Sequence, residues 1–333
     1  MVSPRGRGRK AEWLMEDLVP EVREGKPREA GLTIVLDKLS QRHTEEWLEM
    51  ASRYVDYAKI GWGLPLLVDL RDLTDRVRTY QEWDISVGVG GTLLELAEVK
   101  GVSSHLLDRL WELGFDAVEV SSGSVDIPLE RRLRLIEEAS DRGFRVFAEV
   151  GKKDPARQMP LSAVIGEISG ILKHGVAWKV VIEGRESGKS ACIFDSHGNI
   201  RWGWLTSLAS TFGPDSLVFE APFTHQQAAL IKYLGPNVNL ANISPSEVLS
   251  LESLRLGLRG DTFMMPSSLD VPGGPSSKFV YYLLKHEGPL PTREIVRMTG
   301  LPRRTVNNAL RILREAGFVT AVGEGRTAVW VAL

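Results

Sequence analysis

The chain has 333 residues, of which 43% are hydrophobic and 25% charged, and its formal net charge is −2. These values are ordinary for a folded globular protein and exclude collagen-like, intrinsically disordered and disulfide-rich classes. The single cysteine, Cys192, permits neither an internal disulfide nor a cysteine-rich zinc site. No apolar run approaches the roughly 20 residues of a membrane helix. Acidic residues interrupt the segment after the basic start, where a signal peptide would need an apolar core, so we expect a cytoplasmic protein with no membrane partner.

Eight short apolar runs, each followed by a stretch with helical periodicity, recur through the first three quarters of the chain. They are residues 32–38, 57–62, 85–89, 117–121, 145–150, 178–183, 217–221 and 238–243. Eight strand–helix units in succession predict an α/β protein with a (β/α)8 TIM barrel. A doubly wound open sheet is the alternative, but it would usually show a glycine-rich turn after the first strand, and residues 37–41 contain no glycine.

Charged residues occupy one alternate set of positions in these strands, while the other set is nearly all aliphatic. Because side chains alternate between the two faces of a strand, we assign the aliphatic set to the helix layer and the charged set to the barrel interior. Most of the charges end their strands, at the face where barrel active sites lie. The charged set is Asp37, Lys59, Glu119, Glu149, Lys179, Glu183, Arg185 and Glu220.

A ring of this kind has two interpretations. Internal ion pairs that only fill the barrel are the structural one, but burying so many ionisable groups for packing alone is costly. A mixed ring of acids and bases suits a metal ion together with an anionic substrate. Three loops add cations or flexible glycines near strand or helix ends, at Lys152-Lys153, Arg185 and Arg259. The ring contains no histidine, so we do not expect a histidine-ligated zinc.

Segments throughout the barrel region resemble the phosphosulfolactate synthase family of the coenzyme M pathway. The resemblance implies a TIM barrel that adds sulfite to phosphoenolpyruvate with Mg²⁺, although the family also has relatives outside methanogens that need not make coenzyme M. The matching segments are Lys26–Glu29, Gly31–Lys38, Lys59–Gly63, Gly90–Thr92, Glu149–Lys153, Ile182–Gly188, Phe219–Pro222, Gly235–Leu240 and Leu254–Thr262.

The resemblance also implies roles for the ring residues. Glu149, Glu183 and Glu220 would hold the metal ion. Lys153 would protonate C2 of the substrate, with Lys152 as the other candidate, and crowded cations would lower the pKa of the donor ammonium toward a useful range. The expected substrate-binding residues are Lys59, Arg185, Asp37, Lys38 and Arg259.

Two positions depart from the family pattern. Leu39 stands where the family usually has glycine, and Ser122 stands where it tends to have aspartate. Loss of a carboxylate at residue 122 would remove a metal or substrate contact. Residues 26–29, which approach the first strand, would either cover the barrel mouth or simply form an ordered lead-in to that strand.

The C-terminal segment differs in charge from the rest. Residues 275–333 carry nine Lys or Arg against four acidic residues, whereas the remainder carries 32 basic and 39 acidic residues. We therefore divide the chain into a lead-in (1–25), the barrel (26–265), a linker rich in Pro, Gly and Ser (266–275) and a C-terminal domain (276–333).

Predicted helices at residues 277–286, 293–298 and 303–316, followed by strands at 318–322 and 327–331, resemble a winged helix–turn–helix domain. Such a domain would bind double-stranded DNA, and a protein-interaction or dimerisation module is the alternative. One small domain makes few phosphate contacts, so we expect a homo-oligomer that pairs two half-sites. The expected DNA contacts are Arg303, Arg304, Asn307, Asn308, Arg311 and Arg326.

Two function classes therefore stand. One is a lyase-type synthase with an appended DNA-binding regulatory domain. The other is a transcriptional regulator whose barrel only senses a phosphorylated or sulfonated metabolite.

Overall fold

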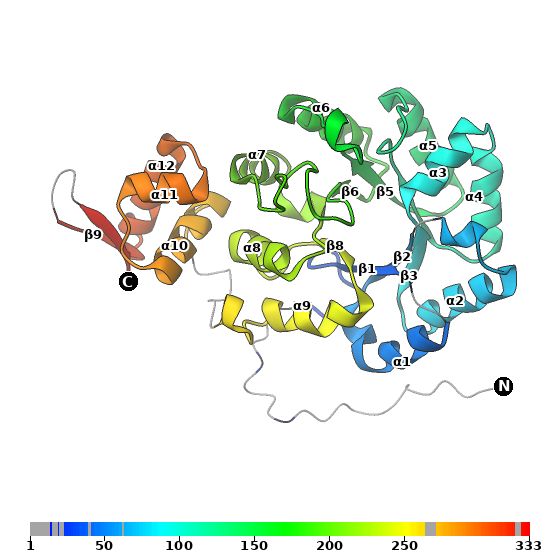
Figure 1. Ribbon diagram of the computed structural model, residues 1–333, viewed down its shortest axis with the longest axis horizontal. Helices are drawn as coiled ribbons and strands as arrows, with labels where there is room; N and C mark the ends of the chain where they lie inside the picture. Colours follow the sequence, from blue (N-terminus) through cyan, green and yellow to red (C-terminus); the bar gives the residue numbers. More distant parts are fainter. Residues whose placement is uncertain are drawn as a thin grey trace.

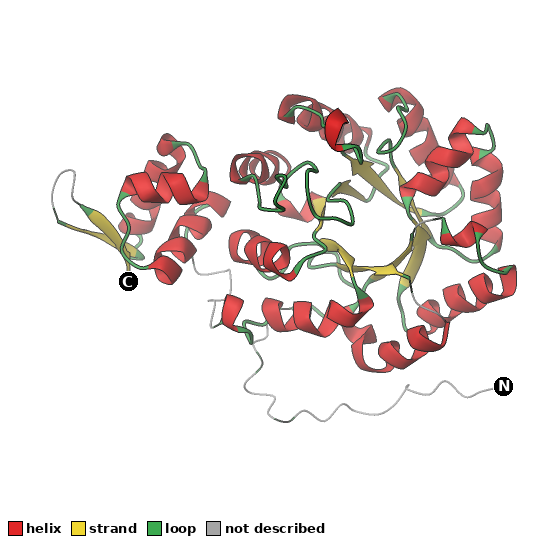
Figure 2. Ribbon diagram, in the orientation of Figure 1, coloured by secondary structure: helices red, strands yellow, loops and turns green. Residues whose placement is uncertain are grey.

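The computed structural model describes residues 14, 19, 23–38, 41–61, 63–263, 271–323 and 328–333. Eight parallel strands form a closed barrel in chain order, and the first strand pairs with the last, so the predicted TIM barrel is confirmed (Figure 2). Each predicted apolar run contains one strand. The strands are β1 (Thr33–Asp37), β2 (Tyr57–Ile60), β3 (Ser86–Val89), β4 (Ala117–Val120), β5 (Arg145–Val150), β6 (Lys179–Ile182), β7 (Leu217–Glu220) and β8 (Leu240–Ile243).

Nine α-helices among the described residues surround this barrel (Figure 1). Local chemistry sets their ends: α2 begins after Asp69, whose carboxylate accepts the Arg71 N–H at 2.8 Å, and α6 ends just before Gly175, whose φ of 77° favours glycine. The helices are α1 (Gln41–Ala51), α2 (Leu70–Glu82), α3 (Gly91–Val99), α4 (Ser103–Glu112), α5 (Leu129–Asp141), α6 (Leu161–His174), α7 (Trp202–Phe212), α8 (Thr224–Leu234) and α9 (Val248–Arg255).

The strands separate two apolar layers. The larger layer joins the outward strand side chains, such as Val118 and Ala148, to the surrounding helices. The smaller one fills the barrel interior with Leu32, Ile34, Tyr57, Ala117, Phe147, Val181, Val218 and Ala241. On β2, β4, β5, β6 and β7 the charged residue of the predicted ring follows the interior apolar residue by two positions. The charged side chains therefore lie in the next layer of the barrel interior, closer to the carboxyl ends of the strands than the apolar layer.

Strand β1 has the opposite phase from the one we predict. Ile34 belongs to the interior cluster, whereas Asp37 is turned toward the helix layer, where its carboxylate pairs with Arg76 of α2 at 2.9 Å. The prediction for Asp37 as an inward, substrate-binding residue is therefore wrong. Because apolar residues occupy both faces of this strand, only Asp37 indicated which face points inward. That indication was misleading, because the buried Arg76 of α2 compensates the charge of Asp37.

The lead-in to β1 lies at the opposite end of the barrel from the mouth. Arg28 pairs with Asp56, which directly precedes β2, at 2.9 Å. Lys26 donates to the carbonyl oxygens of Ser52 and Trp83, which also precede strands. Of the two interpretations of residues 26–29, covering the mouth is thus excluded.

A smaller unit follows the barrel (Figure 1). It contains three helices, α10 (Pro275–Glu287), α11 (Thr292–Thr299) and α12 (Arg303–Glu315), and an antiparallel pair of strands, β9 (Val319–Val322) and β10 (Val329–Ala332). Pro275, the last residue of the predicted linker, already belongs to α10, and residues 264–270 lie outside the described residues. Assignment of this unit to the winged helix–turn–helix class stays a prediction.

The smaller unit lies beside α7 and α8 of the barrel, and its helix α10 contacts both (Figure 1). Phe279 of α10 stacks on Trp202 with the ring centroids 4.1 Å apart, and it meets the ring of Tyr233 edge-on at 5.0 Å. Trp202 is the first residue of α7. In the described part of the chain, no helix is both long and apolar enough to cross a membrane.

Candidate active site

A cavity of about 710 Å³ opens at the carboxyl ends of the barrel strands. It brings together most of the charged residues that the strand pattern places inside the barrel. Its polar lining consists of Lys59, Glu119, Glu149, Lys153, Glu183, Arg185, Glu186, Ser187, Glu220 and Asn242, with Gly90, Gly91 and Thr92 at the start of α3.

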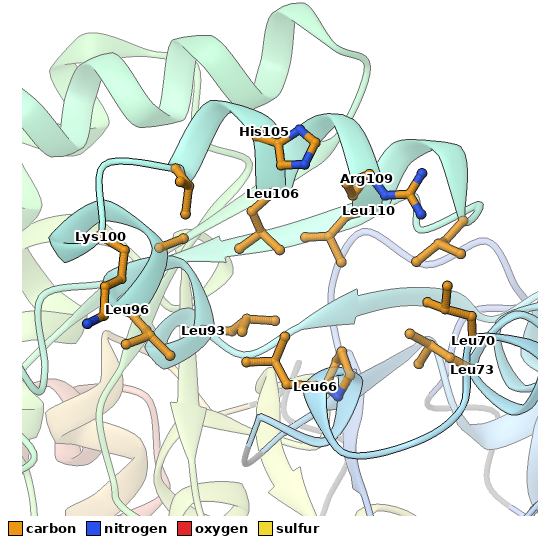
Figure 3. A pocket seen from close by; sticks show the side chains of 14 residues that line it. Leu66, Leu70, Leu73, Leu93, Leu96, Lys100, His105, Leu106, Arg109 and Leu110 are labelled. Atoms are coloured by element: carbon orange, nitrogen blue, oxygen red, sulfur yellow. The ribbon is translucent and has the colours of Figure 1, made fainter.

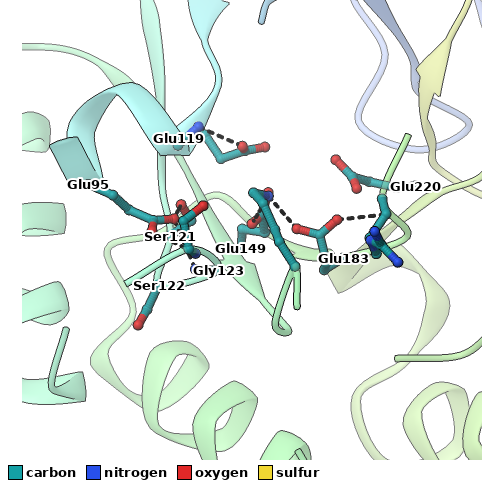
Figure 4. A network of polar contacts seen from close by, with 12 residues as sticks. Glu95, Glu119, Ser121, Ser122, Gly123, Glu149, Glu183 and Glu220 are labelled. Carbon is teal, nitrogen blue, oxygen red and sulfur yellow. Dashed lines mark hydrogen bonds and ion pairs between the residues drawn. The ribbon is translucent and has the colours of Figure 1, made fainter. Parts of the chain in front are cut away.

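Three buried glutamates form the centre of this cavity (Figure 4). Glu119, Glu149 and Glu220 come from β4, β5 and β7, and each offers one carboxylate oxygen within 4.8 Å of the others. Glu183, predicted as the third metal ligand, lies beside them but bonds instead to Lys153 and to the Arg185 N–H. This grouping differs from the predicted metal ligands at one position, with Glu119 in place of Glu183, and the ligand assignment stays a prediction.

Two lysines neutralise part of this charge. Lys59 Nζ lies 2.6 Å from a Glu220 oxygen and 3.3 Å from a Glu119 oxygen. Burial alone would lower the pKa of Lys59, but these carboxylates outweigh burial and raise it above its ordinary value. Lys59 is thus a permanent cation at the base of the cavity.

Lys153 is the second lysine, and it lies between two carboxylates rather than among cations. Its Nζ is 2.8 Å from Glu149 Oε1 and also bonds to Glu183. Burial would lower the pKa of Lys153, but Glu149 and Glu183 together raise it above its ordinary value. The predicted lowering by crowded cations is therefore wrong for the cavity as it stands.

The surroundings shift the pKa values of these glutamates in different directions. Burial opposes ionisation of Glu149, yet Lys153 and Lys59 lower its pKa to about 2. Burial, reinforced by the charges of Glu149 and Glu220, raises the pKa of Glu183 well above its ordinary value. Burial also raises the pKa of Glu119 to about 7. The surroundings therefore favour a proton on Glu183 and on Glu119, and they favour the ionised form of Glu149.

The three central glutamates fit a hard divalent cation. Glu149 Oε2 is buried and has no hydrogen-bond partner among the described residues. Five carboxyl groups and three cationic side chains line the cavity, so full ionisation would leave negative charge uncompensated. Carboxylate oxygens from three strands are ligands that Mg²⁺ accepts.

Other predicted substrate residues lie at or beyond the rim. Arg185 lines the cavity, and its left-handed φ of 58° marks a constrained backbone. Lys38 forms an ion pair with Glu186, which joins the end of β1 to the loop after β6. Lys152 turns to the carbonyl oxygen of Ser122, at 2.6 Å, and to Asp126, so it points out of the cavity.

Arg259 does not belong to the mouth. It follows α9, and a helix that follows a barrel strand ends at the opposite face of the barrel. Its guanidinium pairs with Asp261 at 3.2 Å and donates to the Ser250 hydroxyl. The prediction of a substrate contact for Arg259 is therefore wrong.

The departure at residue 122 does not remove a ligand from the central trio. The Ser122 hydroxyl donates to the Val125 carbonyl and accepts the Ile127 N–H, and it points away from the glutamates (Figure 4). Asp126 supplies the carboxylate that pairs with Lys152. Leu39, the other departure, lies outside the described residues.

The sequence prediction overlooked two cavity residues besides the role of Glu119. Asn242 follows two apolar residues on β8, has a left-handed φ of 59°, and carries a buried Oδ1 with no partner among the described residues. Thr92 lies at the start of α3 beside Gly91, whose N–H donates to Glu119 at 2.8 Å. Thr92 lies in a segment of the family resemblance and Asn242 lies outside those segments, and neither residue carries a charge that would single it out.

A second cavity of about 340 Å³ lies between α2, α3 and α4 (Figure 3). Leucines line most of it, with Lys100, His105 and Arg109 at its border. Because none of its lining residues is acidic, this cavity offers no carboxylate for a cation and does not compete with the mouth as the candidate active site.

The predicted DNA-contacting residues lie on the exposed side of α12. Arg303, Arg304, Asn307 and Asn308 are exposed, whereas Val306 and Leu310 of the same helix are buried. Arg311 pairs with Glu315 at 2.8 Å and with Asn308. Arg326 lies outside the described residues.

Comparison with known proteins identifies the barrel. The family described as "(2R)-phospho-3-sulfolactate synthase (ComA)" matches residues 21–261. The chain belongs to the phosphosulfolactate synthase family. It is 44% identical to phosphosulfolactate synthase of Methanocaldococcus jannaschii over 236 residues, covering 70% of this chain and 94% of the relative. It is also 36% identical to phosphosulfolactate synthase of Bacillus subtilis over 252 residues, covering 73% and 96%.

Two further points follow from the comparisons. The phosphosulfolactate synthase match ends at residue 261, before α10, so the smaller C-terminal unit lies outside it. A more distant relative, Protein HEAT-STRESS-ASSOCIATED 32 of Arabidopsis thaliana, is 24% identical over 256 residues and carries a different kind of name. Membership therefore supports an enzyme in general, and its particular reaction must be argued from the cavity.

Proposed function

We propose that the barrel catalyses addition of sulfite to phosphoenolpyruvate, forming a carbon–sulfur bond as in a phosphosulfolactate synthase, and that the reaction depends on Mg²⁺. One observation carries the proposal: the trio of Glu119, Glu149 and Glu220 shares a cavity with Lys153 in a barrel that matches this family over its whole length.

The proposed reaction forms one bond at each alkene carbon. The sulfur lone pair of sulfite attacks C3, and the electron pair of the double bond moves to C2 and into the adjoining carboxylate. A proton then adds to C2 and gives the saturated phosphosulfolactate. Mg²⁺ held by Glu119, Glu149 and Glu220 would act as a Lewis acid that stabilises negative charge on the substrate carboxylate.

Lys153 is the proposed source of the C2 proton. It is a charged ammonium that reaches into the cavity, and its side chain remains one-third exposed. The two carboxylates that raise its pKa hold the proton too tightly for easy donation. Once a cation compensates Glu149, that restraint weakens and the ammonium becomes a better acid.

The anionic ends of the substrate need donors at the rim. Arg185 supplies a guanidinium there, and residues 90–92 supply backbone N–H groups at the start of α3. Lys59, expected to bind substrate, also has to balance Glu119 and Glu220. We therefore assign to Arg185 the larger share of phosphate or carboxylate binding.

The test is an assay of the purified full-length protein with phosphoenolpyruvate, sulfite and MgCl₂. Loss of the enol absorbance and a new phosphorus NMR signal for the saturated product are expected, and EDTA should abolish both. Binding of phosphoenolpyruvate without any turnover would instead favour a metabolite sensor that acts through the C-terminal domain.

We propose, as a second function, that the C-terminal domain binds double-stranded DNA. The supporting observation is the pattern on α12, which buries Val306, Leu310 and Leu313 and exposes Arg303 and Arg304 in its first turn. The start of the second helix of a helix–turn–helix usually meets base edges, and arginine and asparagine suit guanine and adenine.

This second proposal is tested by fluorescence anisotropy of the full-length protein with mixed genomic fragments over a range of salt concentrations. Binding should weaken steeply as salt rises, because phosphate contacts release counterions. Absence of binding even at low salt would leave the domain as a protein-interaction module.

A further inference from the structure

Glu95 of α3 is buried, with 2% of its surface exposed, and it faces the loop that joins β4 to α5. Its carboxylate accepts the N–H groups of Gly123, Ser124 and Val125 at 2.8–2.9 Å. It also accepts the hydroxyl of Ser121 (Figure 4). One side chain thus collects four donors from five consecutive residues.

The same loop holds the backbone of the proposed proton donor. The Gly123 carbonyl accepts the Lys153 N–H at 3.0 Å. A Cβ added at Gly123 would lie 3.0 Å from Lys153 Cγ and 3.1 Å from Glu149 Oε1, which is tighter than ordinary contact. The backbone at residue 123 therefore passes directly beside the Lys153 side chain, and a shift of the loop would move both.

The two carboxylate oxygens of Glu95 suit it to holding this loop in place. Four neutral donors satisfy its carboxylate, and both oxygens are used: Oε1 by Ser121 and Gly123, and Oε2 by Ser124 and Val125. A carboxylate can accept at both oxygens, whereas an amide has only one oxygen and turns N–H groups toward the other donors. The loop geometry thus depends on two acceptor oxygens at residue 95.

We propose that Glu95 is a positioning residue for Lys153: it fixes the β4–α5 loop, and through the Gly123 carbonyl it holds the Lys153 ammonium against Glu149 and Glu183. This role rests on the proposed function of Lys153 as proton donor. It makes α3, which bears no proposed catalytic side chain, part of the proton-transfer machinery.

The main test is a double-mutant cycle between Glu95→Gln and Lys153→Ala, measured with full-length protein. A small misplacement of a reacting group costs about 10- to 100-fold in rate, so Glu95→Gln should lower kcat by that factor and leave KM for both substrates within about twofold. In the Lys153→Ala background, the same change should lower kcat by less than about threefold, because the two residues act as a unit. Equal losses of kcat in both backgrounds would overturn the proposal.

A second readout does not depend on turnover. Amide hydrogen exchange of the Lys153 N–H should speed up by about tenfold or more in Glu95→Gln, since its acceptor carbonyl moves with the loop. Unchanged exchange at Lys153 would overturn the positioning role even if the barrel proves inactive. If the wild type proves inactive but Glu95→Gln still speeds exchange at Lys153, the result contradicts the proposed function and leaves the positioning role standing.

Two further variants control for folding. Glu98→Gln changes a glutamate one turn later on the same helix, α3. Glu98 does not line the cavity, and its carboxylate lies 2.6 Å from the Arg131 guanidinium, so this variant should leave kcat unchanged. Ser121→Ala removes only one of the four donors to Glu95 and should give a smaller loss than Glu95→Gln. If Glu95→Gln does not fold, Ser121→Ala decides: accelerated exchange at Lys153 supports the proposal, and unchanged exchange contradicts it.

Discussion

The Arg76 guanidinium lies 2.9 Å from the Asp37 carboxylate, and both side chains are almost completely buried between β1 and α2. This ion pair joins the strand that closes the barrel to the helix layer. Breaking one partner of such a pair leaves an uncompensated charge in a region from which water is excluded.

Asp37→Asn should therefore lower the free energy of unfolding by about 3–5 kcal/mol, the usual cost of orphaning a buried charge. KM for phosphoenolpyruvate should stay unchanged, because Asp37 faces α2 rather than the mouth. Urea denaturation and steady-state kinetics measure the two effects. Asp75→Asn, which breaks an exposed pair with Arg78 on the same helix, should cost less than about 1 kcal/mol. A large rise in KM for Asp37→Asn would restore the substrate-binding role.

Lys153→Ala should reduce kcat by about 10²–10⁴, the range for a lost general acid. Lys152→Ala, its neighbour, should have a much smaller effect, because Lys152 bonds to Ser122 and Asp126 outside the cavity. Single-turnover kinetics of the two variants compare the lysines directly. The assignment fails if the neighbour proves the more damaging change.

The sequence was sufficient for the barrel, because all eight strands and the inward charges on β2, β4, β5, β6 and β7 follow from alternation. It was insufficient where a charge has a partner that comes from another element. Asp37 looks like a ring residue until Arg76 is placed beside it. Glu119 and Glu183 have the same pattern, and only the geometry shows which of them completes the trio. Arg259 was misplaced although its position along the chain argues against a substrate contact, because a helix that follows a barrel strand ends at the face opposite the mouth.

Cys192 should resist thiol reagents in the native protein. It is 2% exposed, and burial raises the pKa of its thiol to about 12, so almost no thiolate forms at pH 8. Native protein should react with a disulfide reagent only at the rate of local or global opening, and protein in urea should react at once. Rapid stoichiometric labelling without denaturant would contradict the buried position of this loop.

Lys26 should make stability depend on alkaline pH. Burial lowers the pKa of this half-buried ammonium to about 8, below its value in the unfolded chain. Between about pH 8 and pH 10.5 the unfolded state therefore binds more protons, so the free energy of unfolding should rise with pH in this window. Relative to Lys26→Met, the wild type should gain on the order of 1–2 kcal/mol across it, allowing for the part of the side chain that stays in water. Denaturation of both proteins at a series of pH values gives the comparison, and parallel curves would rule the effect out.

Arg303→Ala combined with Arg304→Ala should weaken DNA binding by about tenfold or more. It should also make the slope of log affinity against log salt concentration shallower by about 2, because about two phosphate contacts are lost. Anisotropy titrations at several salt concentrations measure both. Arg42→Ala with Arg78→Ala removes the same charge from exposed sites on α1 and α2, far from α12 (Figure 1). Similar losses in both double variants would mean that overall charge, rather than α12, governs binding.

The aromatic contact between Phe279 and Trp202 determines how the two units can be separated. A barrel ending at residue 263 would present the rings of Trp202 and Tyr233 to water, although they pack on Phe279 in the intact chain. Such rings contribute about 0.5–1.5 kcal/mol per pair beyond the apolar area that they cover. The joint is thus a shared core rather than a hinge between interchangeable modules. A replacement domain grafted onto this barrel would need its own aromatic residue at that point on its first helix.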